Sequence, residues 1–326
     1  MKKFMKGCAI AAFIMIVLGL GFALVAGTVR GSAAITEVVE RVTGKRIHIN
    51  LGWDRLPFGI YIEDDWFGDS DWNYKLGDIG IFDNDHEVLK GDEATIHPDS
   101  DAEIKELDIE LGGCSFETHT SDTGEFYVKT SGMGKIQVYE KKGKLYIKSV
   151  NTHVILPFNL GTNFGKIILY VPEDYYCEKV KIELGAGEMT FDDLNAEKIS
   201  MEVGAGVIRC KGISAQELEA SVGMGQIELS KMDVDKLEAE VGMGEFVGSG
   251  AIGSSAKLEC AMGNIELTLD GSSQDYNYKL EAAAGNVDIG RESFSGLATE
   301  RRLNNNAERT LEIECSMGNI SVQFTE

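Results

Sequence analysis

Apolar and polar residues alternate in a block that recurs five times between Val180 and Leu267. Each block has three alternate apolar residues, a glycine-rich triplet and two further alternate apolar residues. The blocks occupy 180–191, 199–210, 218–229, 237–248 and 256–267, so each begins 19 residues after the one before. A fixed period of about 20 residues is typical of a solenoid built from stacked turns.

The glycine-rich triplet marks a corner in each turn. Val203 and Ile208 are five residues apart, so the alternation shifts by one residue across the triplet between them. Small residues permit the tight bend that this shift requires. We therefore predict an all-β, single-stranded parallel β-helix whose equivalent residues stack ~4.8 Å apart. The predicted corner glycines are Gly185, Gly187, Gly204, Gly206, Gly223, Gly225, Gly242, Gly244, Gly263, Gly285 and Gly318.

Weaker copies of the block extend the predicted solenoid domain to residues 106–326. Copies begin at Leu107 and Tyr127, and later copies begin at Tyr278 and Leu311. Lys141 to Lys144 is typical of a hairpin tip, and the polar insertion 291–310 is predicted to be a surface loop. With the copies stacked in chain order, the Tyr278 copy separates Cys260 from Cys315. Two turns, ~9.6 Å, would be too far for a disulfide.

The run GKIILYVPEDYYCEKVKIELGAGEMTF at 165–191 has a strand that ends in Val171-Pro172-Glu173-Asp174 before the first glycine corner. This pattern resembles the bacterial putative-adhesin family of β-strand-repeat domains, a family of unknown function. The resemblance covers roughly residues 105–326. It implies a β-strand-repeat fold and a cell-surface setting, and it implies no reaction.

The N-terminal sequence is typical of a membrane anchor. Residues 8–29 are 22 consecutive residues without a charge, long enough as a helix to span ~33 Å. Lysines at positions 2, 3 and 6 favour a cytoplasmic N-terminus. We predict a cytoplasmic tail at 1–7, a single transmembrane helix at 8–29, a juxtamembrane helix at 30–46 and an acidic, aromatic linker or cap at 47–105. The alternative is a cleaved signal peptide.

The formal net charge of −22 argues against nucleic acid or anionic lipid as a partner. The fourth residue of successive turns is nearly always glutamate, which predicts a column of carboxylates on one face. Neighbouring charges ~4.8 Å apart repel by ~0.9 kcal/mol even in water. Lys181, Lys257 and Lys279, or a divalent cation such as calcium, could relieve the repulsion; the alternative is an ordinary solvated face. The candidate metal ligands are Glu183, Glu202, Glu240, Glu259 and Glu281.

Catalytic signatures are weak in this sequence. The five histidines are scattered before the regular turns, and the glycine triplets lack the Gly-Lys-Ser/Thr ending of a phosphate loop. We therefore predict a non-enzymatic, membrane-anchored extracytoplasmic protein that contacts a cell-wall polymer or a membrane protein. An envelope-stress sensor that acts through a membrane partner and a polysaccharide lyase or hydrolase are the alternatives.

Overall fold

The computed structural model describes residues 47–50, 59–62, 89–98, 103–150, 165–295 and 299–325. The chain divides into two units, Met1–Asp83 and Asn84–Glu326. In the first unit, β1 (Ile47–Asn50) pairs antiparallel with β2 (Gly59–Ile62). The predicted tail, transmembrane helix and juxtamembrane helix lie outside the described residues. Within the ranges given above, no helix has the length and apolar character needed to cross a membrane.

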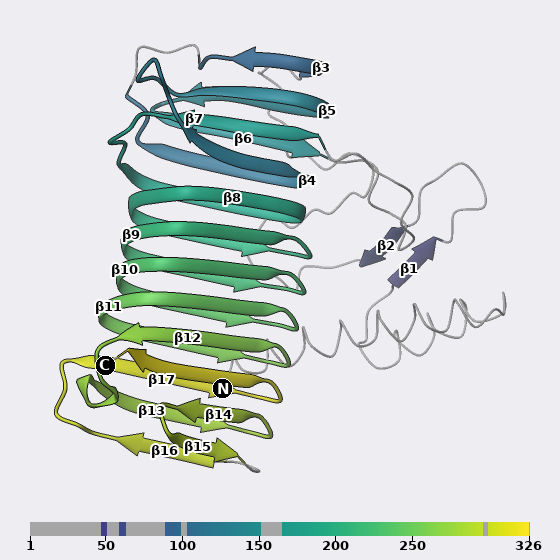
Figure 1. Ribbon diagram of the computed structural model, residues 1–326. Coiled ribbons are helices and arrows are strands. Elements are labelled where there is room, and N and C mark those ends of the chain that lie inside the picture. Colours follow the sequence, from purple (N-terminus) through teal and green to yellow (C-terminus); the bar gives the residue numbers. More distant parts are fainter. Residues whose placement is uncertain are drawn as a thin grey trace. The chain divides into compact units, whose positions relative to one another are not determined.

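The second unit contains one sheet of sixteen strands and a short 3₁₀ turn at Ser273–Asp275 (Figure 1). The strands are β3 (Leu89–Ile96), β4 (Glu106–Thr120), β5 (Tyr127–Lys141), β6 (Lys144–Val150), β7 (Lys166–Val171), β8 (Cys177–Val203), β9 (Val207–Val222), β10 (Gln226–Val241), β11 (Glu245–Cys260), β12 (Asn264–Asp270), β13 (Tyr276–Ala282), β14 (Asn286–Ile289), β15 (Glu292–Ser295), β16 (Thr299–Leu303), β17 (Arg309–Cys315) and β18 (Asn319–Thr325).

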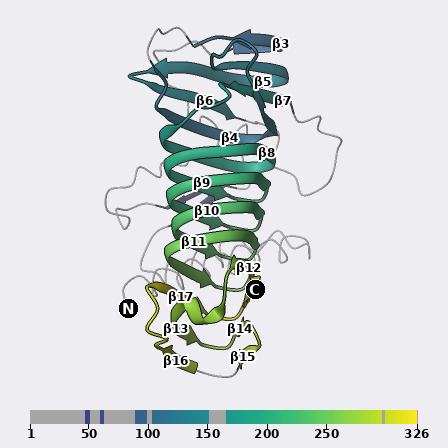
Figure 2. The same ribbon diagram turned by 60° about the vertical axis from the view of Figure 1, so that its left-hand side comes forward.

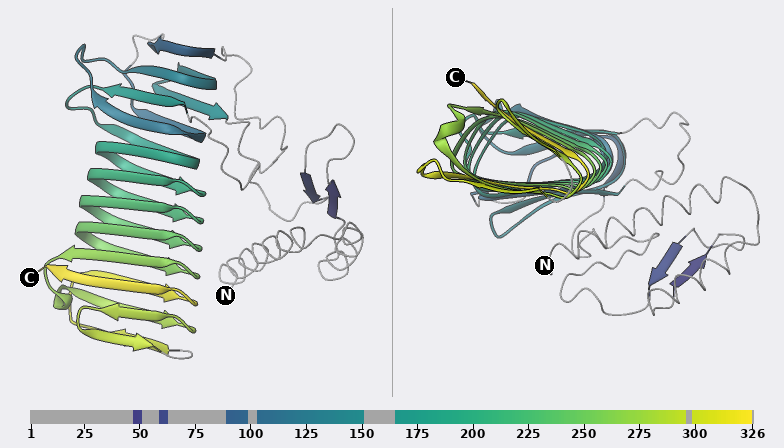
Figure 3. Two further views of the ribbon diagram at one scale, coloured as in Figure 1. Left: turned by 45° about the vertical axis from the view of Figure 1, so that its right-hand side comes forward. Right: turned by 90° about the horizontal axis from the view of Figure 1, so that it is seen from below.

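Strands β8 to β12 wind as a parallel coil with the predicted register. Leu218 pairs with Leu237 and Ile227 pairs with Phe246, in each case 19 residues further along the chain. These side chains are buried inside the coil. Viewed along the stack, the strands of successive turns superimpose around this core (Figure 3). The all-β, mostly parallel architecture predicted from the alternation is therefore confirmed.

The glycine corners lie one above another along one edge of the coil, where each turn bonds to the turn before it (Figure 1). The third position of each triplet is the most crowded. A Cβ on Gly244 would lie 2.1 Å from the carbonyl oxygen of Gly225, whereas a Cβ on Gly242 would lie 3.1 Å from that of Gly223. Alanine already occupies the first position in the next turn, as Ala261. Close backbone approach therefore makes glycine necessary mainly at the third position.

The C-terminal strands are stacked out of chain order, so the predicted order of the last turns is wrong. Strand β17 pairs with β11 on one side and β13 on the other, and β18 pairs in the same way with β12 and β14. Figure 1 shows β17 between the turns of β12 and β13. Cys260 and Cys315 are consequently direct register partners, not two turns apart.

The copy at Tyr278 begins 22 residues after Ala256, three more than the regular period, and these extra residues let the chain pass over one strand position. Gly271, with φ +104°, and the 3₁₀ turn that follows it lengthen the connection between β12 and β13. The amide of Gly271 donates to Thr325 O on β18, 3.2 Å away. The longer insertion after β14 then lets the chain return and fill the open position.

Antiparallel strands cover both ends of the coil (Figure 2). At one end β5 pairs antiparallel with β6, β7 and β3, so the predicted parallel turn at Tyr127 is wrong. The predicted hairpin tip joins β5 to β6, and β3 lies within the segment expected to be a linker or cap. At the other end β15 pairs with β14 and β16 pairs with β13. The insertion 291–310, which was predicted to be a surface loop, therefore contributes two strands. An uncovered edge would expose unpaired backbone groups that attract other chains.

Gly244→Ala and Gly242→Ala form a matched pair within one corner. We expect Gly244→Ala to lower the free energy of unfolding by about 2 kcal/mol or more, because the added methyl group collides with the Gly225 backbone. Gly242→Ala should cost less than about 1 kcal/mol. Urea unfolding followed by circular dichroism measures both. Equal losses would contradict the crowding at the third position.

Engineered cysteines distinguish the observed strand order from the chain order. Thr310 pairs with Ser255 on one side and with Asn277 on the other. We therefore expect Ser255→Cys/Thr310→Cys to form a disulfide on mild oxidation, because neighbouring strands lie within bridging distance. Ser255→Cys/Asn277→Cys would bridge only if the turns were stacked in chain order. Mass spectrometry of non-reduced peptides identifies which bond forms and separates it from any Cys260–Cys315 bond.

Candidate functional site

The predicted carboxylate column is present on the outer face of the first half of each turn. Register pairs join Glu110 to Glu183, Glu202 to Ser221, Ser221 to Glu240, Glu240 to Glu259, Glu259 to Glu314 and Glu314 to Glu281. The alternation of buried and outward residues along each strand places these side chains on the outside. The inserted strand β17 places Glu314 between Glu259 and Glu281, where chain order would place it last.

Lysines two residues earlier in the turn neutralise both ends of this column. Lys181 Nζ lies 2.7 Å from Glu183 Oε1 and 3.4 Å from Glu110 Oε1. At the other end Lys279 bonds Glu312 and lies 3.5 Å from Glu281 Oε1. The lysine relief that the sequence predicted therefore operates where those lysines occur.

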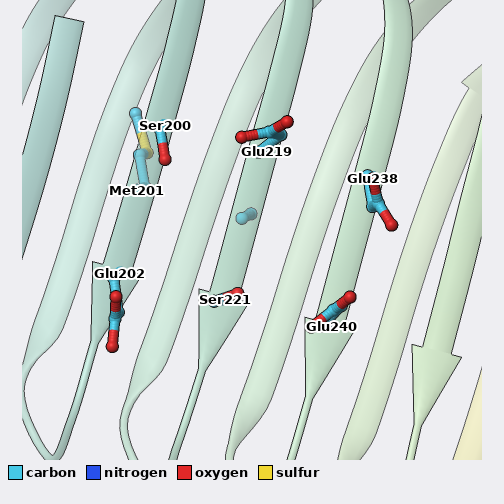
Figure 4. Close-up of a pocket in the computed structure, with 8 residues that line it drawn as sticks. Ser200, Met201, Glu202, Glu219, Ser221, Glu238 and Glu240 are labelled. Carbon is cyan, nitrogen blue, oxygen red and sulfur yellow. The ribbon is translucent and has the colours of Figure 1, made fainter. Parts of the chain in front are cut away.

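The middle of the column is more acidic than its ends. On three successive turns Ser200, Glu219 and Glu238 occupy the position that lysine occupies on the turns of Lys181, Lys257 and Lys279. Figure 4 shows these residues in one row and Glu202, Ser221 and Glu240 in a second row. The two rows, on β8, β9 and β10, line a shallow depression of about 250 Å³. We call it the acidic depression. Only Glu202 and Glu240 were among the predicted ligands.

The pKa values reflect this crowding of like charges. Partial desolvation, followed by the neighbouring Glu183 carboxylate, raises the pKa of Glu202 above its usual value, although Lys181 opposes the shift. Desolvation and the carboxylates of Glu259 and Glu281 likewise raise the pKa of Glu314. Deprotonated glutamates at these positions are therefore disfavoured by the fold, and a cationic ligand would relieve the cost.

Three carboxylates come close enough to share a cation. Oxygen atoms of Glu238, Glu240 and Glu259 lie within 4.8 Å of one another. However, Lys257 Nζ lies 2.8 Å from Glu238 Oε1 and also bonds Glu259. Partial burial lowers the pKa of Lys257, but its bonds to both glutamates outweigh that effect and the pKa is raised. An internal ammonium group therefore already supplies positive charge to this cluster.

The remaining predicted ligands do not form one site. Glu183 lies on the turn next to Glu202, whereas Glu281 lies at the far end of the column, beyond Glu314. The sequence interpretation missed Glu219 and Glu238, which occupy the second residue of their blocks and therefore the first outward position of the turn. Their signal was available, because the second residue of successive blocks is also consistently polar or charged.

Part of the chain matches a known protein family. Residues 104–246 match the Toastrack DUF4097 family, so the predicted family resemblance is confirmed over that part of the chain. A search of the curated proteins gave no match.

Three solved structures are similar over most of the chain. A putative adhesin from Bacteroides fragilis is 15% identical, with a TM-score of 0.39, and the match covers 72% of this chain and 97% of that one. A putative lipid binding protein from Parabacteroides distasonis is 17% identical, with a TM-score of 0.42 and coverage of 72% and 98%. A putative cell adhesion protein from Clostridium sporogenes is 15% identical, with a TM-score of 0.32 and coverage of 72% and 99%.

Substitutions in the acidic depression should have opposite effects at neutral pH. Because the pKa of Glu202 is raised in the fold, ionised Glu202 destabilises the native state, and this penalty disappears as the pH falls through the folded-state pKa. Glu202→Gln should therefore stabilise the protein by less than about 1 kcal/mol near pH 7, with no gain near pH 3. Glu219→Gln should destabilise it slightly at neutral pH, because Lys198 Nζ lies 2.8 Å from Glu219 Oε1. Melting curves across this pH range measure both; a loss for Glu202→Gln near pH 7 would contradict the assignment.

Lys257→Met tests whether the lysine substitutes for a bound cation. We expect the variant to melt at a lower temperature, because Glu238 and Glu259 would lose their shared ammonium partner while they remain close to Glu240. Calcium at about 5 mM should then raise the melting temperature of the variant more than that of the wild type. Magnesium and sodium at matched ionic strength are the controls. An equal calcium response in both proteins would exclude competition between Lys257 and the metal.

Proposed function

We propose that this chain is a membrane-anchored, single-pass, extracytoplasmic protein that acts by binding and not by catalysis. Residues 8–29 form the anchor in this proposal, and the outer face of the coil is the contact surface. The partner is a cell-wall polymer or a membrane protein that offers cationic groups to the acidic depression.

The carboxylate column is the observation that carries this proposal. Its members repeat at the strand spacing of ~4.8 Å, which suits a partner whose binding groups also repeat. Partial burial, and then the neighbouring carboxylates, raise the pKa values of Glu202 and Glu314, so their ionised forms carry a cost that the nearby lysines do not remove. A cationic partner would be attracted to this charge, and the complex would be stabilised by the pairing of opposite charges.

The surroundings of these carboxylates favour binding over catalysis. A carboxylate pair that performs acid-base chemistry requires two environments that separate the pKa values of its members. Here the carboxylates lie on equivalent positions of successive strands, along an open face, and the acidic depression is shallow. This arrangement supplies many similar weak contacts, as an interaction surface does.

Membrane fractionation tests the anchor. The full chain is expected to stay in the membrane pellet after carbonate extraction, because an apolar helix of 22 residues resists extraction. A variant that lacks residues 1–30 should appear in the soluble fraction. Added protease should degrade the coil domain in spheroplasts if it lies outside the cell. Release of the full chain by carbonate would refute the anchor.

Retention on cell-wall polymer and on solubilised membrane proteins tests the contact surface. The full chain in detergent should retain one of these partners, and Glu202→Gln/Glu240→Gln should reduce retention several-fold. Glu188→Gln/Glu228→Gln is the matched control, since both glutamates pair with Arg209 outside the depression. Equal retention by both double variants would refute the proposed surface. Polymer cleavage that is lost in Glu240→Gln/Glu259→Gln would support an enzyme instead.

A further inference from the structure

The middle residue of four consecutive corners is methionine. Met224, Met243, Met262 and Met317 occupy this position, and we call them the methionine column. Met317 joins the column only because β17 and β18 lie against β11 and β12. In chain order, the corner that contains Ala284 would have separated it from Met262.

Backbone hydrogen bonds hold the four methionines in register. The amides of Met224, Met243 and Met262 donate to Gly204 O, Gly223 O and Gly242 O at 2.7, 2.8 and 2.8 Å. The amide of Met317 donates to Ala261 O at 2.7 Å. The four side chains therefore project from the same edge of the coil at intervals of ~4.8 Å.

The fold does not require methionine at these corners. The equivalent positions on other turns are Ala186, Ala205 and Ala284, and the amides of Ala205 and Ala284 make the same kind of backbone bond. Met224 and Met317 are 59% and 58% exposed, so they contribute little to the core. Single exposed apolar side chains are ordinary on a protein surface, but four methionines in one column form a contiguous apolar edge that the core does not need. This excess indicates a role outside the fold.

The methionine column borders an open groove with a suitable charge. The groove is lined by Met224, Met243 and Met262 together with a row of polar residues that includes Gln226, Glu245 and Asn264. Glu245 Oε2 accepts a hydrogen bond from Gln226, and its Oε1 accepts one from Asn264, at 2.9 and 3.1 Å. The lining contains one carboxylate and no lysine or arginine. A cation that enters is not repelled.

We propose that the methionine column binds a soft monovalent cation, Cu(I) or Ag(I). Thioether sulfur is a soft ligand that prefers these ions to calcium, magnesium or zinc. Methionine has three rotatable side-chain bonds, so sulfur atoms from neighbouring turns can converge on one ion although their backbones are fixed. Met243 and Met262, at the centre of the column, would contribute to every such arrangement. The ion binds in its reduced form, so no electron transfer is needed.

Leucine substitutions separate metal binding from apolar contact. Met243→Leu/Met262→Leu removes two sulfur atoms and preserves an apolar edge of similar volume. Met201→Leu is the control, because Met201 is buried in the core. Each full-length protein is titrated with Ag(I) by calorimetry, and with Cu(I) under anaerobic conditions against a chromogenic Cu(I) chelator. We expect at least about tenfold weaker binding for the double variant and no change for the control.

The pH dependence distinguishes thioether ligands from the cysteines. Any thiol that binds a metal ion must release its proton, so metal binding to a cysteine would weaken as the pH falls. Burial strengthens this effect at Cys114, Cys177 and Cys210, whose pKa values it raises to about 12. Thioethers carry no proton, and we expect the affinity of the methionine column to be the same near pH 5 and pH 7.5. Unchanged Ag(I) binding by Met243→Leu/Met262→Leu would overturn the proposal. Capture of the same apolar ligand by wild type and double variant, without Ag(I) binding by either, would overturn it in favour of an apolar docking edge.

Discussion

Successive turns of the coil meet most closely at the third glycine of each corner. There the backbone of one turn lies against the backbone of the next, with no space for a Cβ between Gly244 and Gly225 or between Gly225 and Gly206. This close approach keeps the interstrand hydrogen bonds of the corner short and in register. A side chain at the third position would push the turns apart and disturb the register of both flanking strands. The remaining features of the coil depend on that register.

The register between turns also determines how side chains are arranged on the outer surface of the coil. Because the regular turns have the same length, a residue type that recurs at the 19-residue period becomes a straight column on the surface. Glutamates form one such column on the strand face, and methionines form another along the corner edge. The two columns differ in chemistry, since one is anionic and relieved by lysines whereas the other is neutral and rich in sulfur. A regular coil can in this way present separate surfaces to separate ligands.

The first and last strands of the coil are covered by antiparallel strands. A parallel stack leaves unpaired backbone groups on its first and last strands, and these would pair with other chains. Here antiparallel strands cover both ends, with β3 and β5 at one and β15 and β16 at the other. At the C-terminal end the chain first forms β13 and β14 and leaves one strand position open between them and β11 and β12. Strands β17 and β18 then occupy that open position. This placement brings Cys260 beside Cys315 and Met262 beside Met317.

The amino-acid sequence by itself determined the period, the corners, the buried positions and the outward glutamates, because all of these depend on contacts between residues at fixed short separations. Val203, Gly204 and Ile208 indicate a strand, a corner and a second strand without knowledge of any other turn. Only the tertiary structure decided which edges pair with which. The copies that begin at Tyr278 and Leu311 have almost the same alternation, so either could pair with β11, and connection lengths and end coverage determine the choice. The complete methionine column depends on that order, because Met317 lies beside Met262 only when β17 and β18 pair with β11 and β12. The acidic depression lies on turns that stack in chain order, so the polar second residues of its blocks could have indicated it from the sequence.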